Sequence, residues 1–282
     1  MSSTGAVFSL SIARCVALRR PERTEVPFPY FQTQMTIQKT LLCLLLTLSA
    51  TSLPAFEFGW KLDRGYKYLW LKDKEKIGET VFRFSRKEGV AGGSEYYQLA
   101  SQRKMEAEGK IQDSVGTLLF SKDGAPATYT EKTSFRFASD KSFSAYQEAS
   151  VQFNRDLVTT IYTNNRKKGQ ESRKELKIGK DTFLFSTLCQ EQWNLFTGKL
   201  DTTGPGTIKV LYPEFSEVLK IDFKPEVQSA PLTIGDRKIP VTRFSFEAKK
   251  WKWQGSIWVD AKGRMIQYAS GPLKVVLTGK ID

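Results

Sequence analysis

A period-two alternation of large and polar residues runs through most of the chain, and it is the feature that most constrains the fold. Two neighbouring segments show it clearly, with large side chains at every second position: Tyr66, Tyr68 and Trp70, then Thr80, Phe82 and Phe84. Successive side chains of a strand point to opposite faces of a sheet, so the pattern predicts strands with one buried face. The polar residues 72–76 between the two segments indicate a hairpin connection.

Similar segments separated by turn residues continue to the carboxyl end, and further strands are expected at residues 96–105, 110–120, 128–138, 142–153, 157–162, 207–212, 218–223, 243–247, 251–259, 265–269 and 273–277. Only residues 181–200 depart from this rule, because their apolar spacing suits a helix of two or three turns. The expected fold class is therefore mostly β. It is a large curved antiparallel sheet or an incomplete β-barrel, with one helical insert near residues 183–197 that plugs or covers one end of the sheet.

The amino-terminal region has the organisation of an export signal. A short polar stretch with Lys39 precedes an apolar run at residues 41–50, and small residues and Pro54 follow. This order predicts a signal peptide at residues 35–55, beginning at Met35, since the apolar run is too short to span a bilayer. A short membrane anchor is the alternative.

Residues 1–34 are expected to be an over-extended or disordered amino terminus, with an organelle-targeting extension as the competing interpretation. The remaining residues, 56–282, are expected to form a single β-rich domain. That domain would be periplasmic or extracellular, and it would not be an integral membrane protein after signal cleavage.

The chain is strongly basic, with a formal net charge of +13, of which residues 1–55 carry +3. A basic domain can attract nucleic acid, anionic lipid or acidic polysaccharide, although a lysine-rich soluble surface has the same composition. Nucleic acid is not an expected partner, because an exported chain rarely meets it. Possible partners are therefore lipid, lipoprotein or anionic glycan.

The chain contains no histidine, which excludes Ser-His-Asp and Cys-His catalysis and every histidine-ligated metal site. Cys15 and Cys43 precede the expected domain, so Cys189 would be its sole cysteine, without an internal disulfide. A buried structural thiol is favoured over a nucleophile at this position. No cofactor, metal site or catalytic residue is predicted.

Paired carboxylates are the remaining route to catalysis, since a glycosidase needs two of them at a defined separation. The candidates are Asp140 and Glu148, which flank one expected strand, Glu171 and Glu175, which follow a turn, and Asp236 and Asp260, which are more remote from each other. Any of these six could meet in the fold. Solvated strand and turn residues are the favoured interpretation of all three pairs.

The most distinctive local feature is an aromatic and basic run at residues 249–254. On a strand, Trp251 and Trp253 would share one face, and Lys250 and Lys252 the other. These four residues are the candidate ligand-binding residues, because indole rings stack on sugars or lie at membrane interfaces while lysines attract acidic groups. The alternative is that both tryptophans fill the interior.

The carboxyl-terminal third also carries a resemblance, in Gly235-Asp236-Arg237-Lys238-Ile239-Pro240-Val241-Thr242-Arg243 and in Ser256-Ile257-Trp258-Val259-Asp260-Ala261-Lys262-Gly263-Arg264-Met265-Ile266. These stretches resemble exported bacterial proteins of an uncharacterised family, a domain of unknown function. The chain is similar, more loosely, to the periplasmic lipoprotein-carrier proteins. The resemblance implies a curved antiparallel sheet and an envelope location, and it implies no catalytic residues.

Three functional hypotheses follow. The first is an exported envelope protein of non-catalytic role, whose sheet binds a lipid-like or amphipathic ligand. The second is a carbohydrate-active enzyme that uses paired carboxylates. The third is a structural or interaction module that binds an acidic envelope polymer.

Overall fold

The computed structural model describes residues 59–87, 95–139, 144–164, 170–179, 181–186, 189–226 and 229–279. The predictions for residues 1–34 and for the signal peptide at residues 35–55 lie outside these ranges. Within the ranges, no helix has both the length and the apolar character needed to cross a membrane.

The described residues form one open sheet of fifteen strands and a separate small hairpin. The first limb runs from the joining strand β1 to the edge strand β8: β1 (Gly65–Lys72), β2 (Glu75–Lys87), β3 (Tyr96–Ala107), β4 (Lys110–Ser121), β5 (Pro126–Phe137), β6 (Ser144–Asn154), β7 (Leu157–Asn164) and β8 (Gln170–Lys177). Each of these strands pairs antiparallel with the next in sequence. The residues predicted as a hairpin connection form a two-residue turn, in which Asp73 and Lys74 both have positive φ.

The second limb continues from β1 in the order β17 (Leu273–Thr278), β16 (Met265–Ser270), β15 (Trp253–Asp260), β14 (Val241–Ala248), β11 (Glu217–Pro225), β10 (Gly206–Tyr212) and β9 (Thr182–Leu184). Pairing of β1 with β17 thus joins the two ends of the domain in one sheet. The parallel pair β9–β10 is the exception to an otherwise antiparallel sheet. The separate hairpin consists of β12 (Leu232–Ile234) and β13 (Arg237–Ile239).

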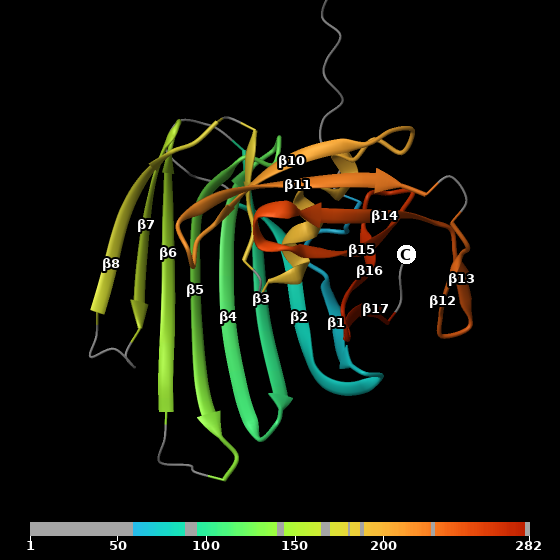
Figure 1. The fold of residues 1–282 in the computed structure, drawn as a ribbon, viewed down its shortest axis with the longest axis horizontal. Coiled ribbons are helices and arrows are strands. Elements are labelled where there is room, and N and C mark those ends of the chain that lie inside the picture. Colours follow the sequence, from blue (N-terminus) through green and yellow to red (C-terminus); the bar gives the residue numbers. More distant parts are fainter. Residues whose placement is uncertain are drawn as a thin grey trace, which may run out of the picture. The chain divides into compact units, whose positions relative to one another are not determined.

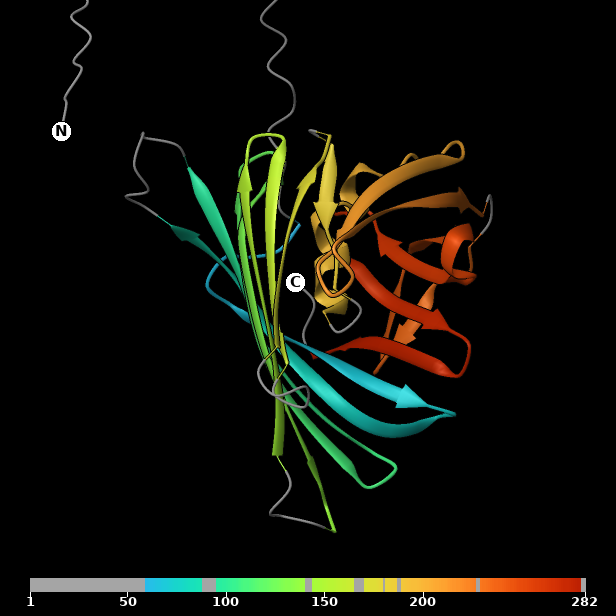
Figure 2. The ribbon, with the colours of Figure 1, turned by 60° about the vertical axis from the view of Figure 1, so that its left-hand side comes forward.

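The sheet is strongly curved, so that its two limbs face each other. Figure 1 shows the long strands β2–β8 as one wall, with β10, β11, β14 and β15 running across them. Figure 2 shows the gap between the limbs, which a short helical segment occupies. The inward-facing aromatic residues of both limbs form one core, and the prediction of a curved sheet or incomplete barrel is confirmed.

The helical insert differs in detail from the prediction of two or three α-helical turns. Residues Thr182–Leu184 form the edge strand β9, and two 3-10 helices follow, η2 (Gln190–Leu195) and η3 (Thr197–Lys199). The i→i+3 hydrogen bonds from Gln192 to Cys189 and from Phe196 to Trp193 define this tighter geometry.

Tertiary contacts explain the 3-10 geometry. Trp193 packs against Phe185, Phe246 and Tyr268 with centroid separations of 4.8, 5.2 and 6.0 Å. The Asn194 side chain donates to the Tyr68 hydroxyl and accepts from the backbone of Met265. The segment is therefore fixed to the strands on both sides of it, and it lies between the two limbs of the sheet.

Candidate functional site

Sheet register places a polar surface on the outer side of β11, β14 and β15. In β14 the inward residues Phe244 and Phe246 alternate with outward residues at positions 243, 245 and 247. Backbone pairing then aligns outward residues of neighbouring strands in rows: Asp222–Glu247–Gln254, Lys224–Ser245–Ser256 and Arg243–Trp258. A polar row across three strands is the expected solvent-facing side of an antiparallel sheet.

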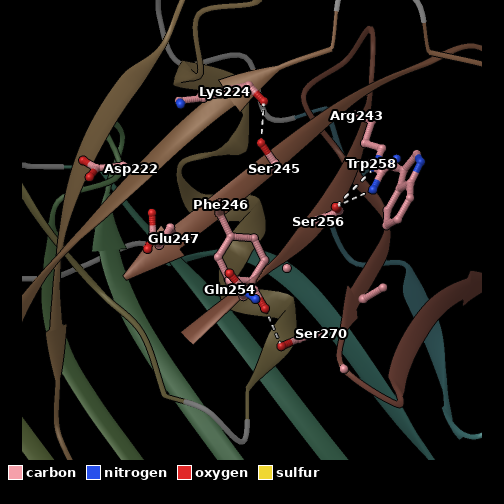
Figure 3. Close-up of a pocket in the computed structure, with 13 residues that line it drawn as sticks. Asp222, Lys224, Arg243, Ser245, Phe246, Glu247, Gln254, Ser256, Trp258 and Ser270 are labelled. Atoms are coloured by element: carbon pink, nitrogen blue, oxygen red, sulfur yellow. Dashed lines mark hydrogen bonds between the residues drawn. The ribbon is translucent and has the colours of Figure 1, made fainter. Parts of the chain in front are cut away.

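These rows line a surface pocket of about 480 Å³. Figure 3 shows Trp258 and Arg243 on one side of it and Asp222 and Glu247 on the other. Small residues lie along β15 and β16, among them Gly255, which has no room for a side chain. Two cationic and two anionic side chains give the wall a balanced charge: Lys224, Arg243, Asp222 and Glu247.

Arg243 is held in place on every side of its guanidinium. Its Nε and Nη2 atoms donate to the Ser256 hydroxyl at 3.1 and 3.0 Å, and Nη1 lies 2.9 Å from the Glu226 carboxylate. The guanidinium carbon stands 5.1 Å from the centre of the Trp258 indole ring. This cation–π contact and the hydrogen bonds hold the half-exposed indole beside fixed donors and acceptors.

The four candidate ligand-binding residues of the aromatic and basic run do not form one strand face. Residues Lys249–Trp251 form a 3-10 turn, η4, and Lys252 adopts the left-handed conformation with φ 51°. β15 begins only at Trp253, so the expectation that Trp251 and Trp253 share one face of a strand is wrong. The left-handed residue interrupts the alternation on which that expectation depended.

The two tryptophans accordingly have different surroundings. Trp253 packs on Phe185 and Phe246 at 5.5 and 4.9 Å, and its Nε1 donates to the Tyr268 hydroxyl. Trp251, which is partly buried like Trp253, packs instead on Tyr212 and Phe215 at the turn between β10 and β11. Lys250 forms an ion pair with Glu217, and Lys252 is exposed.

None of the predicted carboxylate pairs is brought together among the described residues. Glu171 and Glu175 lie on the same edge strand, β8, about 13 Å apart along its length. Asp236 is in the exposed turn between β12 and β13, whereas Asp260 is buried. Glu148 is exposed on β6, and Asp140 lies outside the described residues.

A different set of carboxylates meets inside the sheet, in what we call the buried acidic cluster: Glu131, Glu191 and Glu214. The Ser186 hydroxyl lies 3.0 Å from a carboxylate oxygen of Glu131 and 2.5 Å from one of Glu214. Arg103 is the cation of the cluster, 3.7 Å from Glu131 and hydrogen-bonded to Ser114 at 2.7 Å.

Burial dominates the protonation of this cluster. It raises the pKa of Glu214 to about 7, and it also raises the pKa of Glu191. The adjacent thiol of Cys189 is buried and free, and burial raises its pKa as well. Its sulfur lies 3.5 Å from the Tyr129 hydroxyl, as expected for a structural thiol.

The sequence contained a signal for the cluster. In β5, Glu131 stands in phase with the buried residues Tyr129 and Thr133, so a charged residue occupies an inward position of the alternation. Arg103 stands likewise in phase with Leu99 on β3. A charge at an inward position demands a buried partner, although the alternation does not identify that partner.

Neither the pocket nor the cluster is arranged as a metal centre: the described residues contain no group of three or more Cys, Asp or Glu residues able to hold a metal ion. Within the described residues, Arg103, Glu131 and Glu191 of the cluster are buried between β3, β5 and η2, whereas the outer pocket lies on the surface of the sheet. Its chemistry is recognition by hydrogen bonds and by an indole face.

Comparisons with known proteins give a fold likeness without a function. No family model matches the chain, and no curated protein matches it. It is similar to a beta-barrel-like protein of domain of unknown function DUF1849 from Brucella abortus, with 11% identity, a TM-score of 0.43, and coverage of 76% of this chain and 94% of that one. It is also similar to a DUF1089 family protein from Pseudomonas aeruginosa, with 11% identity, a TM-score of 0.39, and coverage of 67% and 89%.

Proposed function

We propose that the protein is an exported, non-catalytic binding protein that holds a saccharide in the pocket on the outer side of β11, β14 and β15. The observation that carries the proposal is the fixed pair of Arg243 and Trp258 within a pocket of otherwise small and polar side chains. A sugar has apolar C–H faces that stack on an indole, and a rim of hydroxyl groups that both donate and accept hydrogen bonds. The wall offers both kinds of contact.

The balance of charge favours a ligand rich in hydroxyl groups over one that carries a single strong charge. Arg243 and Lys224 supply donors, while Asp222 and Glu247 supply acceptors. Asp222 is already held by Thr207 at 2.7 Å and by Lys249 at 3.8 Å, so one side of the wall is pre-arranged. Pre-arranged polar groups lower the ordering cost of binding.

The interior of the sheet gives less support to a lipid-like ligand. Between the limbs, Trp193, Phe185 and Phe196 are each fully buried, and the segment that carries them packs on both sides. A lipid chain would need that space. The outer pocket needs no rearrangement of the core.

The test is isothermal titration calorimetry of the full chain with three oligosaccharides. They are maltohexaose, which is neutral, N-acetylated chitotetraose, and oligogalacturonate, which is anionic. We expect one of them to bind, and Trp258→Ala to weaken its binding at least about tenfold, which corresponds to about 1.4 kcal/mol.

The matched control is Tyr146→Ala, which removes an exposed aromatic side chain from the outer surface of β6. It should bind as the wild type does. Circular dichroism of each variant establishes that it is folded. Binding of none of the three sugars, equal affinity of Trp258→Ala and wild type, or release of reducing ends during the titration would contradict the proposal.

A further inference from the structure

An exposed aromatic cluster lies on the turn between β10 and β11. Phe215 is 58% exposed, which is the largest exposed fraction of any aromatic side chain in the described ranges. Its ring is 4.7 Å from that of Trp251, which in turn is 4.5 Å from the buried ring of Tyr212. An exposed aromatic side chain fixed on an aromatic base is costly in water, since its apolar surface stays hydrated.

The turn that carries Phe215 is anchored on both sides of it. On one side, the Glu214 carboxyl points inward and accepts a hydrogen bond from Ser186. On the other, the Ser216 hydroxyl lies 2.6 Å from that of Thr160 on β7. Because both neighbours are held inward, Phe215 is held outward.

Exposed lysines lie on the elements that carry this aromatic tip. Lys250 and Lys252 flank Trp251 in sequence, and Lys249 precedes them. Lys209 and Lys220 face each other directly across β10 and β11. Like charges placed opposite one another repel, and an anionic surface lying over them would relieve that repulsion.

Acidic groups near the tip compensate only part of this charge. Glu217 pairs with Lys250, and Asp222 pairs with Lys249 at 3.8 Å. The carboxyl of Glu214 is turned inward to the buried acidic cluster. The surface therefore combines a protruding apolar tip with a net positive surround.

We propose that this surface docks on an anionic phospholipid bilayer through six residues, called here the aromatic–lysine surface: Phe215, Trp251, Lys209, Lys220, Lys250 and Lys252. Phe215 and Trp251 enter the interfacial layer, where amphipathic aromatic rings are favoured. The lysines lie over the headgroups, each contributing attraction to acidic lipid. The site is separate from the saccharide pocket, and its proposal does not depend on the pocket.

The experiment is sedimentation of the full chain with vesicles of phosphatidylethanolamine containing 30% phosphatidylglycerol, compared with vesicles of phosphatidylcholine alone. We expect selective binding to the anionic vesicles that weakens with added salt. Phe215→Ser should lower the partition coefficient about tenfold. The double variant Lys250→Gln with Lys252→Gln should lower it about fivefold for each lysine.

Two matched controls separate a local effect from a general one. Leu157→Ser removes an exposed aliphatic side chain beside another turn, and the double variant Lys104→Gln with Lys174→Gln removes the same charge from β3 and β8. Both should bind as the wild type does, and so should Trp258→Ala, since it alters only the saccharide pocket.

Three results would overturn the inference. One is equal binding to neutral and anionic vesicles, and another is unchanged binding by Phe215→Ser, which would place the contact elsewhere in the chain. The third is a lipid-free dimer in analytical ultracentrifugation that Phe215→Ser dissociates, because the surface would then join two copies of the chain.

Discussion

The side chain of Arg264 donates two hydrogen bonds to one carboxylate oxygen of Asp260, at 2.8 Å from Nε and 2.7 Å from Nη2. Both side chains are almost completely buried. The other oxygen of Asp260 accepts from the backbone N–H groups of Lys262 and Arg264. The Arg264 guanidinium also lies 5.5 Å from the centre of the Trp60 ring, so one carboxylate fixes both the hairpin turn and a remote aromatic side chain.

Gly263 completes this turn, and its surroundings explain why position 263 is a glycine. Its φ is +77°, and a Cβ there would lie 2.6 Å from the Cα of Gly198. The carbonyl of Gly263 accepts a hydrogen bond from the Thr197 side chain at 2.5 Å. The Trp-Val-Asp-x-x-Gly-Arg sequence is therefore a structural element that fastens the helical segment to the β15–β16 hairpin.

The first prediction concerns the Asp260–Arg264 pair. Asp260→Asn keeps the turn acceptor but leaves the buried guanidinium of Arg264 without a counter-charge. Removing one partner of a buried ion pair costs about 3–5 kcal/mol, so the free energy of unfolding should fall by that amount in urea denaturation. Asp236→Asn, in the exposed β12–β13 turn, is the control and should change it by less than about 0.5 kcal/mol. A loss below about 1 kcal/mol for Asp260→Asn would show that the pair is dispensable.

The second prediction concerns Glu214, whose pKa is raised to about 7 from an ordinary value of 4.5. The folded state then binds a proton that the unfolded state has released, so this group lowers stability progressively as pH rises from about 4.5 to 7. The full effect is on the order of 3 kcal/mol.

Glu214→Gln retains the acceptor for Ser186 but cannot ionise. The variant should be more stable than the wild type at pH 8 and show a flatter dependence of unfolding free energy on pH between 4.5 and 7. Glu148→Gln, at an exposed position of β6, should leave the profile unchanged. Parallel profiles for Glu214→Gln and wild type would mean that Glu214 is already ionised in the folded state.

The third prediction concerns the tight approach of β14, β15 and β16 beneath the outer pocket. A Cβ at position 255 would lie 2.3 Å from the carbonyl oxygen of Ala269 and 2.8 Å from the Phe246 ring. Gly255→Ala should therefore destabilise the protein by about 1–3 kcal/mol, measured by thermal and urea unfolding.

Gly206→Ala is the matched control, because a Cβ at that position meets no atom within 4 Å. It should be neutral or stabilising by up to about 1 kcal/mol, since alanine restricts the unfolded chain. Equal free energies of unfolding for Gly255→Ala and Gly206→Ala would contradict the prediction, because β15 and β16 would then accommodate the added methyl group at no cost.

Much of the fold followed from the alternation of residues. Strands were expected at residues 96–105 and 110–120, and β3 and β4 occupy them. In β4, every second residue from Ser114 to Phe120 is buried, as a strand with one inward face requires. The turn at residues 260–263 was equally visible from its residue types. The start of β15 after Lys252 could not be predicted from the sequence. Lysine has no preference for the left-handed conformation that Lys252 adopts there, so its residue type gives no sign of the break.

The candidate sites were less predictable, because the neighbours of a side chain on a sheet depend on register and curvature. Glu131 and Glu214 meet through Ser186 only because the limbs of the sheet face each other, and their separation along the chain carries no such information. Proximity in sequence, as between Glu171 and Glu175, places residues along a line on a strand rather than around a site.

The amino-acid sequence by itself determined most of the strands and turns and the absence of histidine chemistry, since these depend on residue types and their local spacing. It did not indicate the edge strands β8 and β9. The tertiary structure decided which charges are buried together, which aromatic residues each tryptophan packs against and where a surface pocket forms. The physical reason is that alternation fixes the face on which a side chain lies, whereas register and sheet curvature fix what it meets there.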